Sequence, residues 1–200
     1  MIAARLTGLM LAFGLLAARP AAAEDSLKIA IVDVQKVMEA TPEWNQAVTL
    51  LKREWEKKSA ELEAKQNELK TAKEKLEGKR QLVSDAKALA REEEALIERL
   101  KEFRRDTMVS QQMFQQREAF VKEQMLSRIE QVVYKIAADG DYTFIFETGS
   151  PESPNVLFAS KQTNVTELVI GDYGKAFKGK ALETNPPKGA FPPPGAMPTP

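Results

Sequence analysis

The stretch LKIAIV at residues 27–32 decides the fold, together with YTFIFE at residues 142–147. Both stretches are short, apolar and rich in β-branched or aromatic residues, which is typical of strands. The residues between them, 43–138, are highly charged and have a helical pattern. A long helical segment that leaves one strand and returns to another predicts an α+β fold, in which a helical hairpin projects from a small β-containing body.

The first arm of the predicted hairpin begins after Thr41, which can cap a helix with Pro42 at its first position. Apolar residues then recur at every seventh position, while the neighbouring row is mostly polar. Such a single seam indicates a helix that packs along one partner and is not a self-sufficient dimeric zipper. The seam consists of Val48, Trp55, Leu62, Leu69, Leu76 and Val83.

The tip of the hairpin is predicted near residues 78–85, where Gly78 interrupts the pattern and Ser84 or Asp85 can cap the second helix. The second arm has a long apolar seam that Gln-rich stretches break at residues 110–112 and 115–116. Such a break weakens continuous packing, so we expect the arm to bend or splay there. Gly140 is expected to end this arm as a left-handed C-cap.

The body is predicted to consist of residues 24–42 and 139–181. Residues 156–159 are expected to form a strand antiparallel to residues 142–147, and Thr166 to cap a last helix that Gly171 and Gly174 make short or broken. So small a core is marginal alone, which predicts association between copies of the chain. The residues expected to carry association are Ile29, Ile31, Val32, Phe144, Phe146, Leu157 and Phe158.

The two ends of the chain have their own patterns. Residues 1–23 contain Arg5, a short apolar run and an A-x-A site, which predicts a secretory signal peptide cleaved after Ala23. Residues 182–200 are rich in proline, so we expect a disordered tail with almost nothing to bury.

Composition excludes several classes of function. The chain contains no histidine and no cysteine, and it lacks nucleotide-binding and nucleophile motifs, so we expect neither an enzyme nor a metal or cofactor site. Arg5 and Arg19 are the charged residues of the signal peptide, which leaves 27 basic against 29 acidic residues and a formal charge of −2. This balance argues against nucleic acid as a partner.

The chain resembles the Skp/OmpH family of periplasmic chaperones over residues 27–173. The resemblance rests on IAIVD at residues 29–33, on GDY and FIF at residues 140–146, on VLFA at residues 156–159 and on NVTELV at residues 164–169. It implies a homotrimer whose helical hairpins hang as tentacles around a cavity. It further implies an ATP-independent holdase that binds unfolded outer-membrane proteins in the periplasm.

Charge sets this chain apart from the basic members of that family. Residues 43–138 contain 20 basic and 18 acidic side chains, a surplus of only two. Electrostatic capture of lipopolysaccharide or of a membrane surface is therefore left open, and no such site is assigned.

Flexible apolar side chains on the second arm are the candidates for binding clients, since thioethers and aromatic rings fill irregular gaps. The candidates are Met108, Met113, Phe114, Phe120 and Met125. Their alternative role is ordinary packing within the hairpin, which helical spacing favours. Trp44 and Trp55 are expected to anchor the first arm to the body.

A different class of function is also consistent with the sequence. The hairpin could dock onto another coiled coil and make the chain a structural or adaptor protein of a cell-envelope complex. The polar seam and the Gln-rich break favour splaying arms over a continuous docking zipper.

Overall fold

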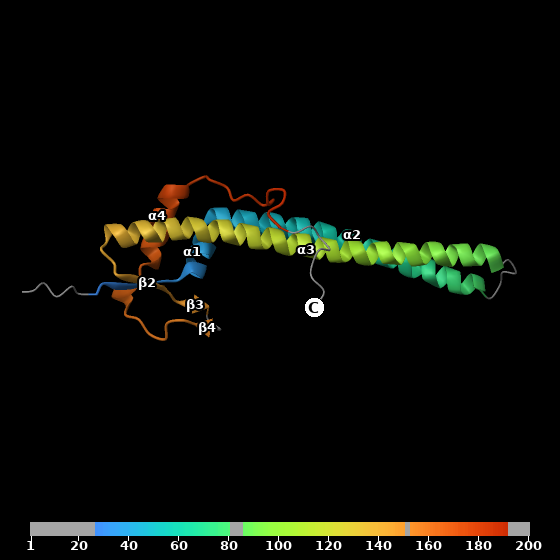
Figure 1. Cartoon of the computed structure of the whole chain (residues 1–200), viewed down its shortest axis with the longest axis horizontal. Helices are drawn as coiled ribbons and strands as arrows, with labels where there is room; N and C mark the ends of the chain where they lie inside the picture. The colour runs from blue at the N-terminus through green and yellow to red at the C-terminus, as the bar shows by residue number, and fades with distance from the viewer. Residues whose placement is uncertain (1–26, 81–85, 151–152, 192–200) are drawn as a thin grey trace, which may run out of the picture.

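The structure is a computed structural model that describes residues 27–80, 86–150 and 153–191. Two long antiparallel helices form an arm, α2 (Pro42–Arg80) and α3 (Ala86–Asp139), which projects from a small body at one end (Figure 1). The body contains β1 (Ile29–Val32), α1 (Val34–Ala40), β2 (Phe144–Glu147), β3 (Gly149–Ser150), β4 (Ser153–Pro154), η1 (Lys161–Thr163) and α4 (Thr166–Phe177). The predicted α+β body with a projecting helical hairpin is confirmed.

The body is organised by a parallel pair of strands. β1 pairs with β2 in the register Ile29 to Phe144 and Ile31 to Phe146. Ala30 and Val32 point to the other face and are buried in the core, as expected from the alternation of side chains along a strand. Since parallel strands require a long crossover, the helical arm itself provides the connection between them.

The arm begins at Pro42, as predicted, but Thr41 does not cap it with its side chain. The Thr41 hydroxyl donates to the carbonyl oxygen of Met38 at 2.7 Å and so satisfies the end of α1. Only its main-chain carbonyl serves α2, because Asn45 N–H donates to it at 3.2 Å. Thr41 therefore joins the two helices at a sharp corner.

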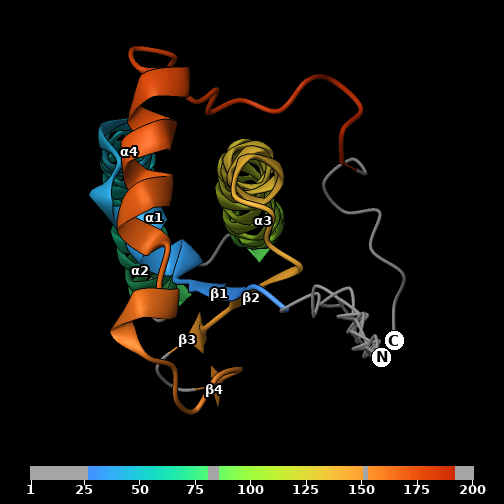
Figure 2. The same cartoon turned by 90° about the vertical axis from the view of Figure 1, so that its left-hand side faces the viewer.

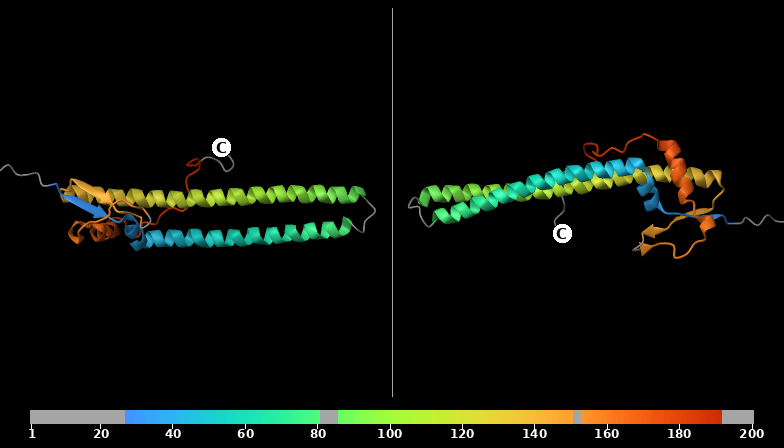
Figure 3. Two further views of the ribbon diagram at one scale, coloured as in Figure 1. Left: turned by 90° about the horizontal axis from the view of Figure 1, so that it is seen from below. Right: turned by 180° about the vertical axis from the view of Figure 1, so that it is seen from behind.

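The predicted seam holds the outer part of the arm together. Leu62, Leu69 and Leu76 are buried between α2 and α3, whereas Val48, nearer the body, is exposed. Figure 3 shows α3 running beside α2 and continuing past it at the body end. The predicted tip, with Val83, Ser84 and Asp85, falls between Arg80 and Ala86 and lies outside the described residues.

The core lies where α4 crosses the base of the arm (Figure 2). Met125 from α3 and Val169 and Tyr173 from α4 are fully buried there. The Tyr173 hydroxyl lies 3.3 Å from the Met125 sulfur and donates to it. Tyr173 also packs on Phe177, with ring centroids 5.0 Å apart. This crossing therefore fastens the arm to the body.

The end of α3 differs from the prediction that Gly140 is a left-handed cap. The left-handed residue is Asp141, with φ of 49°. Gly140 is needed for space instead, because a Cβ there would lie 2.6 Å from the ring of Tyr142. Tyr142 N–H donates to the Ala137 carbonyl at 3.0 Å, so the chain turns tightly toward β2.

The last helix, α4, is longer and differently capped than predicted. It runs unbroken through Gly171 and Gly174, since burial of one face outweighs the cost of about 1 kcal/mol per glycine. Asn164 Oδ1 accepts a hydrogen bond from Thr166 N–H at 2.9 Å. The Thr166 hydroxyl instead accepts from Asp33 N–H, also at 2.9 Å, and ties α4 to the end of β1.

The predicted strand at residues 156–159 is wrong. The antiparallel partner of β3 is β4, two residues long, and residues 156–159 have no strand structure. Pro154 is the last residue of β4, and a proline cannot donate to a strand ladder. The apolar residues that follow are left on the surface.

The predicted tail needs a correction at its start. Leu182 is buried in the core cluster, and the main chain of Glu183 and Thr184 accepts hydrogen bonds from α3. The expectation that residues from 182 onward bury almost nothing is therefore wrong for this part. Residues 192–200, like residues 1–23, where a signal peptide is predicted, lie outside the described residues.

Two methionines test where the core lies. Met125→Ala should lower the free energy of unfolding by about 2–4 kcal/mol, because the truncation leaves a cavity under Tyr173. Met108→Ala, at an exposed site on the same helix, should change it by less than about 0.5 kcal/mol. Urea denaturation followed by circular dichroism measures both, and equal losses would place the core elsewhere.

The loss of unfolding free energy at alkaline pH tests the burial of Tyr173. Burial raises the pKa of the Tyr173 hydroxyl above its ordinary value of 10.0. The neutral phenol is therefore favoured in the folded state. Its stabilising contribution is complete below about pH 10 and is lost as the pH rises through the raised pKa of Tyr173 in the folded state. Urea titrations on both sides of pH 10 should show this loss in the unmodified chain and in Tyr134→Phe. Tyr173→Phe should remove it.

Candidate functional site

The outer face of the strand pair is apolar and uncovered. Ile29, Phe144 and Phe146 are each about half exposed there. The rings of Phe144 and Phe146 are stacked with centroids 5.8 Å apart. The register of β1 and β2 places Ile31, which is partly buried, on this same face. This association face is large and hydrophobic for so small a body, and such patches usually mark protein contacts.

The loop after β4 adds the most exposed apolar residues of the body. Leu157 is 93 % exposed and Phe158 87 %. Because residues 156–159 do not form the predicted strand, neither side chain has a partner sheet within the described part of the chain. The two side chains extend the apolar surface of the body.

Val32 is the exception among the residues predicted to carry association. It is almost fully buried within the chain, because it points to the core face of β1, opposite Ile29 and Ile31. Val32 therefore stabilises the single chain, and its assignment to an interface is corrected.

The arm residues predicted to bind clients divide into three groups. Met108 and Met113 are 57 % and 49 % exposed on α3. Phe114 and Phe120 are partly buried, and Phe114 packs on Trp55 with ring centroids 4.8 Å apart. Met125 is fully buried against Tyr173. Met125 is part of the core and unavailable to a client, so its assignment is corrected.

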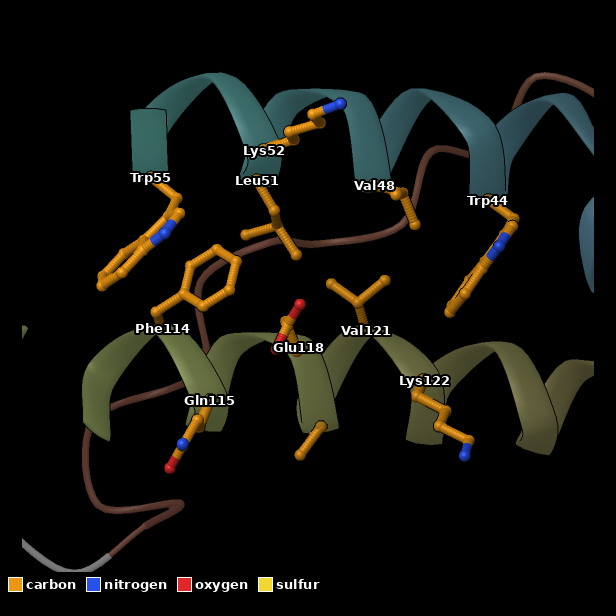
Figure 4. Close-up of a pocket in the computed structure, with 11 residues that line it drawn as sticks. Trp44, Val48, Leu51, Lys52, Trp55, Phe114, Gln115, Glu118, Val121 and Lys122 are labelled. Carbon is orange, nitrogen blue, oxygen red and sulfur yellow. The ribbon is translucent and has the colours of Figure 1, made fainter. Parts of the chain in front are cut away.

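An aromatic groove between α2 and α3 was not predicted as a site (Figure 4). Trp44, Val48 and Trp55 point from α2 toward α3, and Phe114 and Val121 point back. The groove has a volume of about 590 Å³ and is lined mainly by carbon atoms. Trp44 does pack on the core cluster, which agrees with its predicted anchoring role. Trp55 lies farther out and stays within the hairpin.

The sequence did contain a signal for this groove. Trp44, Val48 and Trp55 are spaced by four and seven residues, which places them on one helix face. The α3 side of the lining also includes Gln115, Glu118 and Ala119. Glu118 is polar and points toward α2, whereas Gln115 points away from it (Figure 4). The Gln-rich break of the seam therefore coincides with the open groove.

Ion pairs link the two helices of the arm along its polar edges. Lys65 lies 2.8 Å from Asp106, Arg99 2.6 Å from Glu68, and Lys79 2.7 Å from Glu92. The hydrogen bond from Lys65 lowers the pKa of Asp106, and the one from Arg80 lowers the pKa of Glu93. These pairs are largely solvent-exposed, so each contributes little to stability.

The described residues offer no arrangement suited to metal binding. Among residues 27–80, 86–150 and 153–191, no group of three or more acidic side chains is placed to hold a metal ion. Over the same ranges, no helix has a long enough apolar stretch to cross a membrane. The surfaces that remain as candidates are the association face of the body and the apolar residues of the arm.

Comparison with known proteins gives this arrangement a family. The model of the family described as outer membrane protein (OmpH-like) matches residues 28–173. The chain belongs to the OmpH-like family. The match runs from β1 to α4 and so includes the body and the whole arm, and the resemblance seen in the sequence is confirmed.

A solved OmpH-like structure has a similar fold. It comes from Caulobacter crescentus CB15 and is described as a candidate outer membrane chaperone. The TM-score is 0.66 at 14 % sequence identity, with 80 % of this chain and 89 % of that chain covered. No curated protein matches this OmpH-like chain in sequence. At this identity the similarity concerns the fold.

Charged substitutions on the association face should separate copies of the chain. Phe144→Asp together with Phe158→Asp should convert an oligomer to a monomer, because two carboxylates would have to be desolvated in the interface. Ile97→Asp is the matched control, since Ile97 is exposed on the distal arm. Multi-angle light scattering gives the masses. An unmodified chain that is already monomeric at micromolar concentration would contradict the assignment.

Proposed function

We propose that this OmpH-like chain is an ATP-independent periplasmic holdase chaperone that binds unfolded outer-membrane proteins and prevents their aggregation. The observation that carries the proposal is the separation of two kinds of surface. The body has an exposed apolar face suited to association, and the arm projects from it with a charged exterior and scattered flexible apolar side chains. A holdase needs both, since it must assemble firmly and bind clients loosely.

The assembly in this proposal is a homotrimer. Ile29, Ile31, Phe144 and Phe146, together with Leu157 and Phe158, would be covered by neighbouring copies. Their exposure in the single chain supports association, because burying them removes apolar surface from water at about 25 cal/mol per Å². Three arms pointing the same way would enclose a cavity in which an unfolded chain is kept from its neighbours.

Client contacts in this proposal come from Met108, Met113, Phe114 and Phe120. The two methionines are exposed near the Gln-rich break, where flexible thioethers can adapt to clients of different sequence. The near-equal numbers of acidic and basic residues on the arm keep its surface wetted. Such a surface confines exposed β-strand segments of a client without holding them irreversibly.

Export to the periplasm forms part of the proposal. It rests on the signal-peptide pattern of residues 1–23 and on the expected cleavage after Ala23. The absence of cysteine from the sequence means that the chain needs no disulfide in an oxidising compartment.

A second candidate function is an adaptor of a cell-envelope complex, and the aromatic groove favours it. A cleft lined by Trp44, Trp55 and Phe114 could receive one apolar helix or peptide tightly. An adaptor would bind one partner with fixed stoichiometry, whereas a holdase would bind many unfolded chains of different sequence.

Dilution of an unfolded outer-membrane β-barrel protein out of urea tests the proposal. The mature chain should suppress light scattering and form a stable complex of three chains with one client. Met108→Ser with Met113→Ser should weaken the suppression several-fold at equal oligomer mass, because two exposed apolar contacts are lost. Leu168→Ser on α4, also exposed, is the control and should leave it unchanged. Undiminished aggregation beside a folded oligomer would favour the adaptor.

A further inference from the structure

The segment after α4 runs along the arm as an extended strap, which we define as residues 180–184. It lies antiparallel to α3, with Lys180 beside Arg128 and Thr184 beside Arg117. Residues 117–128 of a helix span about 16 Å, and five extended residues cover nearly the same length. The strap therefore follows the arm without helix or strand structure of its own (Figure 1), and no strand of the described chain pairs with it.

Three side chains of α3 hold the strap. Arg117 Nε donates to the Thr184 carbonyl at 2.8 Å, and the Arg128 guanidinium donates to the carbonyls of Lys180 and Ala181 at 2.5 and 2.9 Å. The side-chain amide of Gln124 donates to the Glu183 carbonyl at 2.8 Å and accepts from Glu183 N–H at 3.2 Å. Gln124 thus pairs with the strap as a residue of a neighbouring strand would.

All five hydrogen bonds use main-chain atoms of the strap. Among its side chains only Leu182 is buried, and the charged or small neighbours on either side of it point to solvent. The row Arg117, Gln124 and Arg128 therefore recognises an extended main chain with one aliphatic residue in the middle. None of these hydrogen bonds involves a side chain of the strap, so the row should accept other side chains at the positions around Leu182.

Arg117 also connects this row to the hairpin. Its guanidinium pairs with Glu54 of α2 at 2.5 Å and is mostly buried. Arg117 therefore has a partner on α2 besides the Thr184 carbonyl of the strap. Release of the strap would break no helix or strand, since residues 180–191 contain none.

We propose that the row Arg117, Gln124 and Arg128 is a binding site for extended segments of unfolded polypeptide, and that the strap occupies it as an intramolecular stand-in which clients displace. The ligand is a main chain in the β conformation with one aliphatic side chain in the place of Leu182. This inference rests on the proposed holdase function and adds both the kind of segment bound and its regulation by the chain itself.

A variant of the full chain in which the strap is displaced allows peptide binding at the site to be measured. Leu182→Asp should release the strap, because a carboxylate cannot take the buried position of Leu182. A fluorescent peptide of residues 178–188 should then bind at least about tenfold more tightly to this variant than to the unmodified chain. Lys188→Asp, at an exposed position beyond the strap, is the control and should behave like the unmodified chain.

Two further variants separate the proposed recognition from nonspecific adsorption. In the Leu182→Asp background, Arg117→Ala with Gln124→Ala and Arg128→Ala should abolish peptide binding. A peptide with alanine in place of Lys180, Glu183 and Thr184 should bind within about twofold, since its main chain and leucine are intact. If Leu182→Asp does not fold by circular dichroism, Leu182→Ser replaces it.

Client competition completes the test. An unfolded outer-membrane β-barrel protein should displace the fluorescent peptide, and Leu182→Asp should suppress client aggregation at lower concentration than the unmodified chain. Absence of peptide binding to a folded Leu182→Asp variant overturns the inference. Peptide binding that no client displaces also overturns it, because the strap would then be a structural fastening. If the unmodified chain still suppresses aggregation in either case, the holdase function stands and only this site falls.

Discussion

The parallel pairing of β1 with β2 is the constraint on which the rest of the structure depends. Parallel neighbours cannot be joined by a tight turn, and here the connection leaves the body as α2 and returns as α3. One face of this pair is covered by α1, α4 and the base of the arm. The other face, with Ile29, Phe144 and Phe146, has no covering layer within the described residues, so the topology of the chain leaves an apolar face exposed on the body.

The base of the arm is well packed, whereas the distal arm is mostly exposed. The core concentrates where α4 crosses α3, around Met125, Val169 and Tyr173. Farther out, the two helices share one narrow apolar seam and exposed ion pairs that contribute little stability. The distal arm is therefore the part in which local opening costs least. The aromatic groove and the strap both lie beside the base of the arm, next to the core cluster.

The fold could be predicted from patterns that are local and repeated. The seven-residue spacing of Leu62, Leu69 and Leu76 predicted the seam, and the two apolar stretches predicted β1 and β2. Features set by tertiary contacts were missed. Met125 is buried because Tyr173, distant in sequence, covers it, and Val32 is buried because residues of α1 and α4 cover its face of the strand pair. Likewise, nothing in the local sequence around Leu182 shows that Gln124 and Arg128 bind the main chain of its neighbours Lys180, Ala181 and Glu183.

In the proposed function, the body assembles the chains while the arm binds the client. A photo-crosslinking amino acid at Met108 on the arm and at Leu157 on the body tests this division most directly, in the presence of an unfolded outer-membrane β-barrel protein. We expect adducts between the arm and the client at residue 108 and adducts between two copies of the chain at residue 157. Client adducts at residue 157, with none at residue 108, would contradict it.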